Sequence, residues 1–356
     1  MTEYPQRRQR VLRDLPEHKA DVLIVSGLPN VRYLSGFTGS NALLLLSKSH
    51  ATLLTDPRYT IQANTESDCT VKIERGSLYE AAAKIFKARR WRSIAFERNR
   101  LTFGAYAELQ HRLGVAATLR PTSGLVEKHR MIKSGTEIVA IRRSVETNSK
   151  AFAQAISRIK PRITEMELAG EIEYRMRKNG AEKPSFETIV ASGLRTALPH
   201  AQPTVERIHK LLLIDMGCMQ AGYASDMTRM LHLGKPGSET RKLYKAVLES
   251  QLAAIQVVRP GVKGGDVDRA ARRVLKAHGF DKYFVHSTGH GLGLEIHETP
   301  RLGKRDATYL EAGMVITIEP GAYIEGVGGV RIEDTVLVTE TGCEILTPTP
   351  KELTII

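Results

Sequence analysis

Residues 211–217 read LLLIDMG, an apolar run that ends in an acid and a glycine. The arrangement recurs at residues 315–321, VITIEPG, and residues 329–338, GVRIEDTVLV, place two acids within a third strand-like run. A core strand excludes a carboxylate unless another group compensates its charge. One such acid is ordinarily paired with Arg or Lys, but several in one region favour divalent cations, which bind carboxylate oxygens directly.

Five residues in these settings are candidate metal ligands. Three come from the apolar runs, and two come from the segments SDMTR at residues 225–229 and TGHGLG at residues 288–293. The complete set is Asp215, Asp226, His290, Glu319 and Glu333. Four carboxylates and one imidazole are suitable donors for two divalent cations, so the pattern is typical of a two-metal hydrolase.

Helical segments surround the acid-bearing runs. The spacing of apolar residues predicts helices at about 134–160, 165–180, 239–258 and 265–278. Ser134 with Glu137, and Thr164 with Glu167, have the spacing of a capping box and mark the starts of the first two helices. Helices segregated from antiparallel strands make an α+β domain. The repeated order of a helix pair followed by strands indicates an internal duplication.

The first third of the chain has a different pattern. Short apolar runs alternate with helix-like stretches between residues 21 and 120, which predicts a small α/β domain. A cluster of turn residues at 121–124 marks its end. A chain of 356 residues also exceeds the roughly 250–300 residues that one core usually serves. We therefore expect an α/β domain over residues 1–124 and a larger α+β domain over residues 125–356.

The composition limits the classes of function. No apolar run approaches the ~20 residues needed to cross a bilayer, and the N-terminal segment is polar and rich in arginine, so we expect a cytoplasmic protein that does not enter a membrane. The three cysteines are widely spaced and indicate neither a disulfide framework nor a thiolate zinc site. The net charge is +13, but its densest clusters, residues 7–10 and 87–92, lack the several aromatic residues of a nucleic-acid surface. A specific nucleic-acid partner is therefore not expected.

Taken together, the motifs resemble those of the pita-bread metallopeptidases, the group that contains methionine aminopeptidase, Xaa-Pro aminopeptidase and Xaa-Pro dipeptidase. The resemblance covers nearly the whole chain. It rests on five segments: LIDMG at 213–217, SDMTR at 225–229, TGHGLG at 288–293, IEPG at 318–321 and RIED at 331–334. It implies a C-terminal pita-bread domain, with duplicated helices on a curved antiparallel sheet, preceded by a smaller α/β domain.

The resemblance also implies how the five ligands divide. Asp215 would bind the first metal, Asp226 and Glu333 would bridge both metals, and His290 and Glu319 would complete the second. A water or hydroxide between the cations would be the nucleophile, and Glu319 could pass a proton to the leaving nitrogen. Because four of the five ligands offer oxygen, we expect manganese first, with cobalt or zinc as alternatives.

Three histidines and an arginine complete the expected site. Taken alone, His200, His286 and His297 would be packed or surface histidines. In the proline-specific branch of the family the matching positions surround the scissile bond: His200 and His297 would bind the substrate, and His286 would line the leaving-group side. Arg331 lies two residues before Glu333, so on a strand both face the same side, where the guanidinium could hold a ligand carboxylate or contact a substrate histidine.

The histidine positions favour the proline-specific branch over methionine aminopeptidase. Within that branch, YLSGFTGS at residues 33–40 and TDPRY at residues 55–59 are more similar to the Xaa-Pro aminopeptidases, so the expected reaction removes an N-terminal residue that precedes proline. The alternative is an Xaa-Pro dipeptidase. More distant alternatives are a non-enzymatic binding protein and a metal-free creatinase-like hydrolase. The implied partners are proline-containing peptides and, because dimers are usual in this family, a second copy of the chain.

Overall fold

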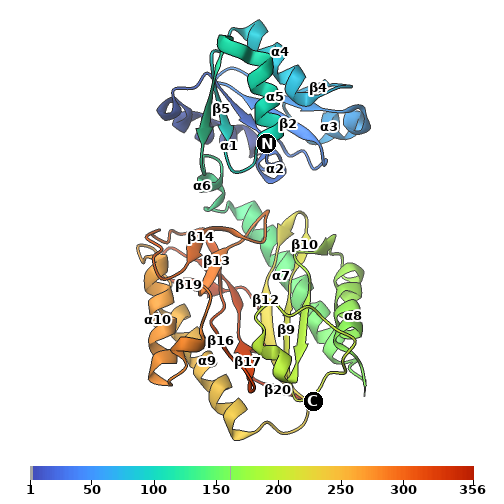
Figure 1. Cartoon of the computed structure of the whole chain (residues 1–356), viewed down its shortest axis with the longest axis vertical. Coiled ribbons are helices and arrows are strands. Elements are labelled where there is room, and N and C mark those ends of the chain that lie inside the picture. The colour runs from blue at the N-terminus through green and yellow to red at the C-terminus, as the bar shows by residue number, and fades with distance from the viewer. Residues whose placement is uncertain (1–2, 161) are drawn as a thin grey trace. The chain divides into compact units, whose positions relative to one another are not determined.

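The computed structural model describes residues 3–160 and 162–356. The chain forms two compact units, Met1–Arg130 and Met131–Ile356 (Figure 1). The division follows the short helix α6 (Glu127–Arg130), just beyond the turn residues at 121–124. Each unit has its own buried apolar core. In the part of the chain that the structure describes, no helix has the length and apolarity that crossing a bilayer requires.

The first unit is built on a six-stranded sheet in the order β4-β3-β2-β1-β5-β6. Leucine and β-branched residues fill both faces of β1 and β2, which are buried along their whole length. Helices α4 and α5 contribute to the core on this sheet. The strands are β1 (Val22–Val25), β2 (Ala42–Leu46), β3 (Ala51–Thr55), β4 (Thr70–Ile73), β5 (Ser93–Glu97) and β6 (Thr118–Thr122). The helices are α1 (Tyr4–Asp14), α2 (Leu28–Ser35), α3 (Thr60–Glu66), α4 (Leu78–Arg89) and α5 (Phe103–Leu113).

Helix α1 is not predicted by the polar, arginine-rich sequence at its position. Two arginines nevertheless anchor it to the unit. The Arg7 side chain is buried and its guanidinium carbon lies 4.4 Å from the centre of the Tyr33 ring. The Arg8 guanidinium pairs with Asp68 at 2.6 Å and donates to the Leu34 carbonyl. The aliphatic stems and guanidinium groups of arginine can therefore hold a helix against its unit where other helices use a stripe of apolar side chains.

Four helices of the second unit form two pairs, one on each side of the sheets in Figure 1. The starts of the first two match the predicted capping boxes. In each, the Ser134 or Thr164 hydroxyl accepts from the amide three residues on, and the glutamate at that position accepts from the capping residue's amide. The pairs are α7 (Gly135–Ile156) with α8 (Glu165–Lys178) and α9 (Ser238–Val257) with α10 (Gly264–Ala277).

Two sheets of the second unit carry the candidate ligands. Their strand orders are β20-β12-β9-β8 and β14-β13-β15-β18-β19, with two smaller sheets, β11-β10-β7 and β16-β17, beside them. The strands up to β12 are β7 (Lys183–Pro184), β8 (Ile189–Ser192), β9 (Leu211–Met216), β10 (Cys218–Gln220), β11 (Tyr223–Ala224) and β12 (Met227–His232). The later strands are β13 (Gly289–Gly291), β14 (Glu298–Leu302), β15 (Val315–Ile318), β16 (Gly321–Ile324), β17 (Gly328–Arg331), β18 (Asp334–Val338), β19 (Cys343–Ile345) and β20 (Thr354–Ile355).

A hairpin leaves the five-stranded sheet between β15 and β18. It consists of β16 and β17, which form a two-stranded sheet. Glu319 and Glu333 lie at its two ends, outside both ladders. Pro320 lacks an N–H and cannot continue the ladder beside Glu319. The acid-bearing run at residues 329–338 is therefore two strands rather than the single strand that its apolar pattern predicts.

Candidate active site

Asp215 and Asp226 are brought together by adjacent antiparallel strands. Asp215 lies within β9 opposite Thr228 of β12, and Asp226 immediately precedes β12. Gly217 permits the close approach of these segments, because a Cβ at this position would lie 2.0 Å from the Ser225 carbonyl oxygen. The glycine that ends the LLLIDMG run is thus a steric requirement of the site.

His290 and Glu319 come from the other sheet and share one threonine. The His290 amide donates to the Thr317 hydroxyl oxygen at 3.1 Å, and that hydroxyl donates to Glu319 Oε1 at 3.3 Å. A Cβ on Gly289 would lie 1.9 Å from the Thr317 carbonyl oxygen, so glycine is required beside His290. Thr317 in this way sets the position of β13 against the end of β15.

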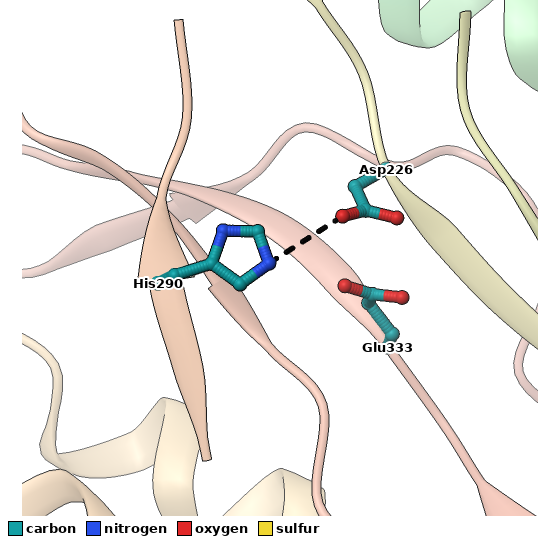
Figure 2. Close-up of side chains that lie close together, drawn as sticks. All are labelled: Asp226, His290 and Glu333. Carbon is teal, nitrogen blue, oxygen red and sulfur yellow. Dashed lines mark ion pairs between the residues drawn. The ribbon is translucent and has the colours of Figure 1, made fainter. Parts of the chain in front are cut away.

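The side chains of Asp226, His290 and Glu333 point toward one another, as Figure 2 shows, and come from the segment before β12, from β13 and from the link between β17 and β18. One ligand atom from each lies within 4.8 Å of the others. His290 Nε2 lies 3.6 Å from Asp226 Oδ2 and 3.4 Å from Glu319 Oε1. Asp215 is close enough for its charge to act on Asp226, Glu319 and Glu333. The structure therefore brings the five predicted ligand residues near one another.

Burial and mutual repulsion raise the pKa values of three acids of this site. Burial raises the pKa of Asp226 well above its ordinary value, and the neighbouring charges of Glu333, Asp215 and Glu319 raise it further. Burial and the charges of Glu319 and Asp215 likewise raise the pKa of Glu333. The pKa of Glu319 rises to about 7, again chiefly through burial. Burial lowers the pKa of His290, which favours the neutral imidazole that a metal requires.

Two carboxylate oxygens at the site have no protein partner. Asp215 Oδ1 and Glu333 Oε1 are buried and accept no hydrogen bond from any residue that the structure describes. A buried carboxylate oxygen left in this state is costly. Divalent cations would bind both oxygens and offset the mutual repulsion of the acids. The residues present therefore fit bound divalent metal.

Arg331 links several groups around the acids. Its Nη2 donates to Asp215 Oδ2 at 2.6 Å and its Nε donates to the Thr228 hydroxyl oxygen at 3.1 Å. The Thr228 hydroxyl in turn donates to Glu333 Oε2 at 2.7 Å. Arg331 and Thr228 thus occupy one oxygen of Asp215 and one of Glu333, and leave the other oxygen of each free to bind a metal.

His286 ends a hydrogen-bond chain that starts at Arg331. Arg331 Nη1 donates to the Tyr323 hydroxyl oxygen at 2.7 Å, and that hydroxyl lies 2.9 Å from His286 Nε2. His286 Nδ1 lies 2.8 Å from the Ser287 carbonyl oxygen and must be the protonated nitrogen, so Nε2 accepts from Tyr323. Burial, with help from the Arg331 charge, lowers the pKa of His286 to about 4, and the imidazole is neutral.

His200 and His297 are exposed. The His297 ring packs edge-on against His290 with 4.4 Å between ring centres, and burial together with the nearby His290 lowers its pKa. His200 follows the short 3₁₀ helix η4 (Gly193–Ala197), and its charge acts on both His286 and His297. The preceding carbonyl, Pro199 O, accepts from Arg331 Nη1 at 3.1 Å. All three histidines therefore lie around the acid cluster.

The sequence did not single out three residues that the site uses. Tyr323, Thr228 and Thr317 each connect two of the predicted site residues. Thr228 lies two residues after Asp226, and Thr317 two residues before Glu319, which is the spacing that places side chains on one face of a strand. That periodicity was the available signal. No local pattern pointed to Tyr323, because its contact with His286 joins residues 37 positions apart and depends on the tertiary fold.

Known proteins are similar to this chain over nearly its whole length. The sequence matches the creatinase/prolidase N-terminal domain over residues 7–132 and metallopeptidase family M24 over residues 139–340. An Xaa-Pro dipeptidase of Pyrococcus horikoshii is 37% identical over 350 residues, 97% of each chain. A solved Xaa-Pro dipeptidase from Bacillus anthracis is 38% identical with a TM-score of 0.96, over 99% of this chain and 100% of that one. A solved X-Pro aminopeptidase from Thermotoga maritima is 35% identical with a TM-score of 0.90, over 97% and 100%.

These similarities extend through both units and include the strands that carry the acids. They confirm the predicted architecture, a pita-bread domain of α+β class preceded by a smaller α/β domain. They also confirm the predicted resemblance to the proline-specific branch. The chain therefore belongs to metallopeptidase family M24, with a creatinase/prolidase N-terminal domain ahead of its peptidase domain.

Proposed function

We propose that this metallopeptidase hydrolyses the Xaa-Pro bond and that free Xaa-Pro dipeptides are its principal substrates. The observation that carries the proposal is the convergence of four acids and one histidine, in which two buried carboxylate oxygens have no partner among the described residues. Such a donor set suits divalent metal, and metal-assisted hydrolysis is the chemistry of the family.

We assign two cations to the site. Asp215 would hold one, His290 and Glu319 the other, and Asp226 and Glu333 both. Manganese is the first choice because four of the five ligands are carboxylates, with cobalt and zinc as alternatives. Bound cations would supply a water nucleophile near neutral pH and stabilise charge on the scissile carbonyl oxygen.

The other residues have roles that suit a bond to proline. The nitrogen of an Xaa-Pro bond is a tertiary amide without an N–H and must gain a proton to leave. We assign the transfer of that proton to Glu319, which lies at the end of β15 beside His290. We assign substrate binding to the exposed His200 and His297. We assign the leaving-group side to His286, held neutral beside Tyr323.

We rank the two proline-specific activities by the similarity of the whole chain to relatives of each kind. The segments at residues 33–40 and 55–59 favour an aminopeptidase, but they are short. The Xaa-Pro dipeptidase of Bacillus anthracis is more similar to the chain, at 38% identity and a TM-score of 0.96, than the X-Pro aminopeptidase of Thermotoga maritima, at 35% and 0.90, and the Xaa-Pro dipeptidase of Pyrococcus horikoshii is 37% identical. We therefore place the dipeptidase first. The aminopeptidase comes second, supported by the Thermotoga maritima structure.

A two-substrate assay tests this order. Purified enzyme with added manganese is given a dipeptide, Xaa-Pro, and the matching tripeptide, Xaa-Pro-Xaa, and kcat/KM is measured for each. We expect the dipeptide to be preferred at least about tenfold, a difference in transition-state binding of about 1.4 kcal/mol. A preference for the tripeptide would reverse the order, and no hydrolysis of either with metal bound would reject the proposal.

Assembly stays a prediction of the family resemblance, and location stays a prediction of the composition. We propose a homodimer in the cytoplasm, and a mass measurement by light scattering during gel filtration tests the dimer.

A specific nucleic-acid partner is not proposed, since the positive charge is not organised around aromatic residues. Binding to nucleic acid that persists at physiological salt would contradict this, because nonspecific phosphate contacts weaken steeply with salt.

A further inference from the structure

One buried acid next to the candidate metal centre has no part in the proposed reaction. Asp334 follows Glu333 directly, and its side chain is fully buried. The two neighbours have different partners: Glu333 Oε2 accepts from Thr228, whereas both oxygens of Asp334 accept from other groups. Asp334 therefore needs a role of its own.

Three elements supply the groups around Asp334. Arg229 of β12 donates from Nη2 to Asp334 Oδ1 at 2.7 Å, and Gln251 of α9 donates from Nε2 to Asp334 Oδ2 at 2.8 Å. Lys351, from the segment before β20, donates from Nζ to the same Oδ2. Two cations and an amide compensate the buried charge without a metal. Asp334 is thus the point where β18, β12, α9 and the C-terminal segment are tied together.

Arg229 connects this point to the backbone of the metal centre. Its Nη1 donates to the Glu333 carbonyl oxygen at 2.5 Å and to the Thr228 carbonyl oxygen at 3.0 Å. Its Nε donates to the Pro350 carbonyl oxygen at 2.8 Å, and Nη2 also donates to the Thr349 carbonyl oxygen at 2.6 Å. All five guanidinium N–H groups are therefore used. One side chain spans from the strand that follows Asp226 to the backbone of Glu333.

Lys351 closes the network from the other side. Besides Asp334, its ammonium donates to Gln251 Oε1 at 3.1 Å. Its carbonyl oxygen accepts from the Tyr244 hydroxyl, so α9 holds the residue at its backbone as well as its side chain. Lys351 is thereby fixed in place rather than resting on the surface, and removing its charge would leave Asp334 Oδ2 with a single amide donor.

We propose that Lys351 is a positioning residue for the metal centre: through Asp334 and Arg229 it fixes the distance between the segments that carry Asp226 and Glu333. This inference rests on the proposed metal site. Metal ligands have to be held within about 0.5 Å of their working positions. Loss of the Lys351 charge lets Asp334 and the guanidinium of Arg229 shift, and the Glu333 backbone shifts with them.

Manganese binding to the full chain tests the proposal. The metal is removed with a chelator, and the affinity for added Mn²⁺ is measured by isothermal titration calorimetry. We expect Lys351→Met to weaken binding by about tenfold or more, the usual effect of removing a group that holds a ligand. Lys351→Arg should recover most of the affinity. The matched control is Lys245→Met, which removes an exposed lysine of α9 and should leave affinity unchanged.

Urea unfolding of the metal-free variants separates positioning from general stability. If Lys351 only stabilises the fold, Lys351→Met unfolds at lower urea but binds Mn²⁺ normally while folded, and that result overturns the proposal. If Lys351→Met does not fold, Gln251→Leu carries the test, with a smaller loss of affinity expected and an unchanged affinity overturning the inference. A parent protein that binds no Mn²⁺ overturns the proposed function and this inference with it, whereas normal binding by both parent and Lys351→Met overturns the inference alone.

Discussion

The neighbouring acids Glu333 and Asp334 differ in how the protein compensates their charge. Glu333 keeps a buried oxygen without a partner in the described chain, while Asp334 has both oxygens bonded to Arg229, Gln251 and Lys351. The sequence shows two acids in an apolar run but not which one is compensated by protein. The family resemblance predicts that Glu333 is the metal ligand. The partners of Asp334 come from residues 17 to 105 positions away along the chain, which no local pattern reports.

Substitutions of the proposed metal ligands and of the proposed substrate-binding histidines should have different effects on metal content. We expect Asp226→Ala and Glu333→Ala to lose metal and nearly all activity, because each removes a shared carboxylate. His297→Ala should keep its metal and lose turnover by about 100-fold or more, since His297 is assigned to the substrate. Metal analysis of dialysed protein, together with initial rates, checks both. Full metal content and normal rates in Glu333→Ala would reject its assignment.

The neutral state of His286 makes a prediction about acid stability. Its folded-state pKa of about 4 lies below the ordinary value of 6.5, so its contribution is present above pH 6.5 and is lost as the pH falls towards 4. Between pH 7 and pH 5 we expect this one group to cost about 2 kcal/mol of unfolding free energy. Urea unfolding in chelator at both pH values measures it.

His286→Gln is the control for that experiment. Glutamine can keep a hydrogen bond to Tyr323 but does not titrate, so the loss of stability between pH 7 and pH 5 should be smaller than in the parent by about that 2 kcal/mol. An equal loss in parent and variant would show that His286 is not held neutral by its surroundings.

At the scale of the elements, the sequence predicts features that depend on near neighbours but not those that depend on the tertiary fold. The capping boxes at Ser134 and Thr164 were predictable because a cap and its partner lie three residues apart. The interruption that puts Glu319 and Glu333 outside the ladders was not, since the apolar alternation runs through it. Only Pro320 marked it. The sequence also predicts that the buried acids need a compensating charge. It does not predict that His290 of one sheet lies beside Asp226 of the other, because that contact depends on the whole fold.

Glycines in the second unit should respond in opposite directions to the same substitution. Gly217→Ala places a Cβ 2.0 Å from the Ser225 carbonyl oxygen, forcing apart the segments that carry Asp215 and Asp226. We expect a loss of about 3 kcal/mol and weaker metal binding. Gly170→Ala, in the exposed middle of α8 with open space around it, should instead stabilise by about 0.5–1 kcal/mol. Urea unfolding and Mn²⁺ titration check the pair, and a tolerated Gly217→Ala with normal affinity would contradict the steric argument.

At the scale of the whole molecule, the residues predicted for the site all come from one of the two units. Every predicted ligand, histidine and arginine of the site belongs to Met131–Ile356. The first unit, Met1–Arg130, has its own sheet and its own apolar core. Length and the change of pattern near residues 121–124 were enough to predict two domains, because each must bury a core of its own. The boundary at residues 124–125 stays a proposal.

Metal binding should therefore stabilise the two units unequally. A ligand that binds only the folded state stabilises it by about 2.7 kcal/mol at a concentration 100 times its dissociation constant. Trp91, the only tryptophan in the sequence, lies in the first unit against Phe86, with 6.1 Å between ring centres. Its fluorescence reports on that unit, while far-ultraviolet circular dichroism reports on both. In thermal scans with chelator and with manganese, we expect the metal to raise the circular dichroism transition by several degrees and to leave the tryptophan transition nearly unchanged. Equal shifts of both signals would show that the two units unfold as one.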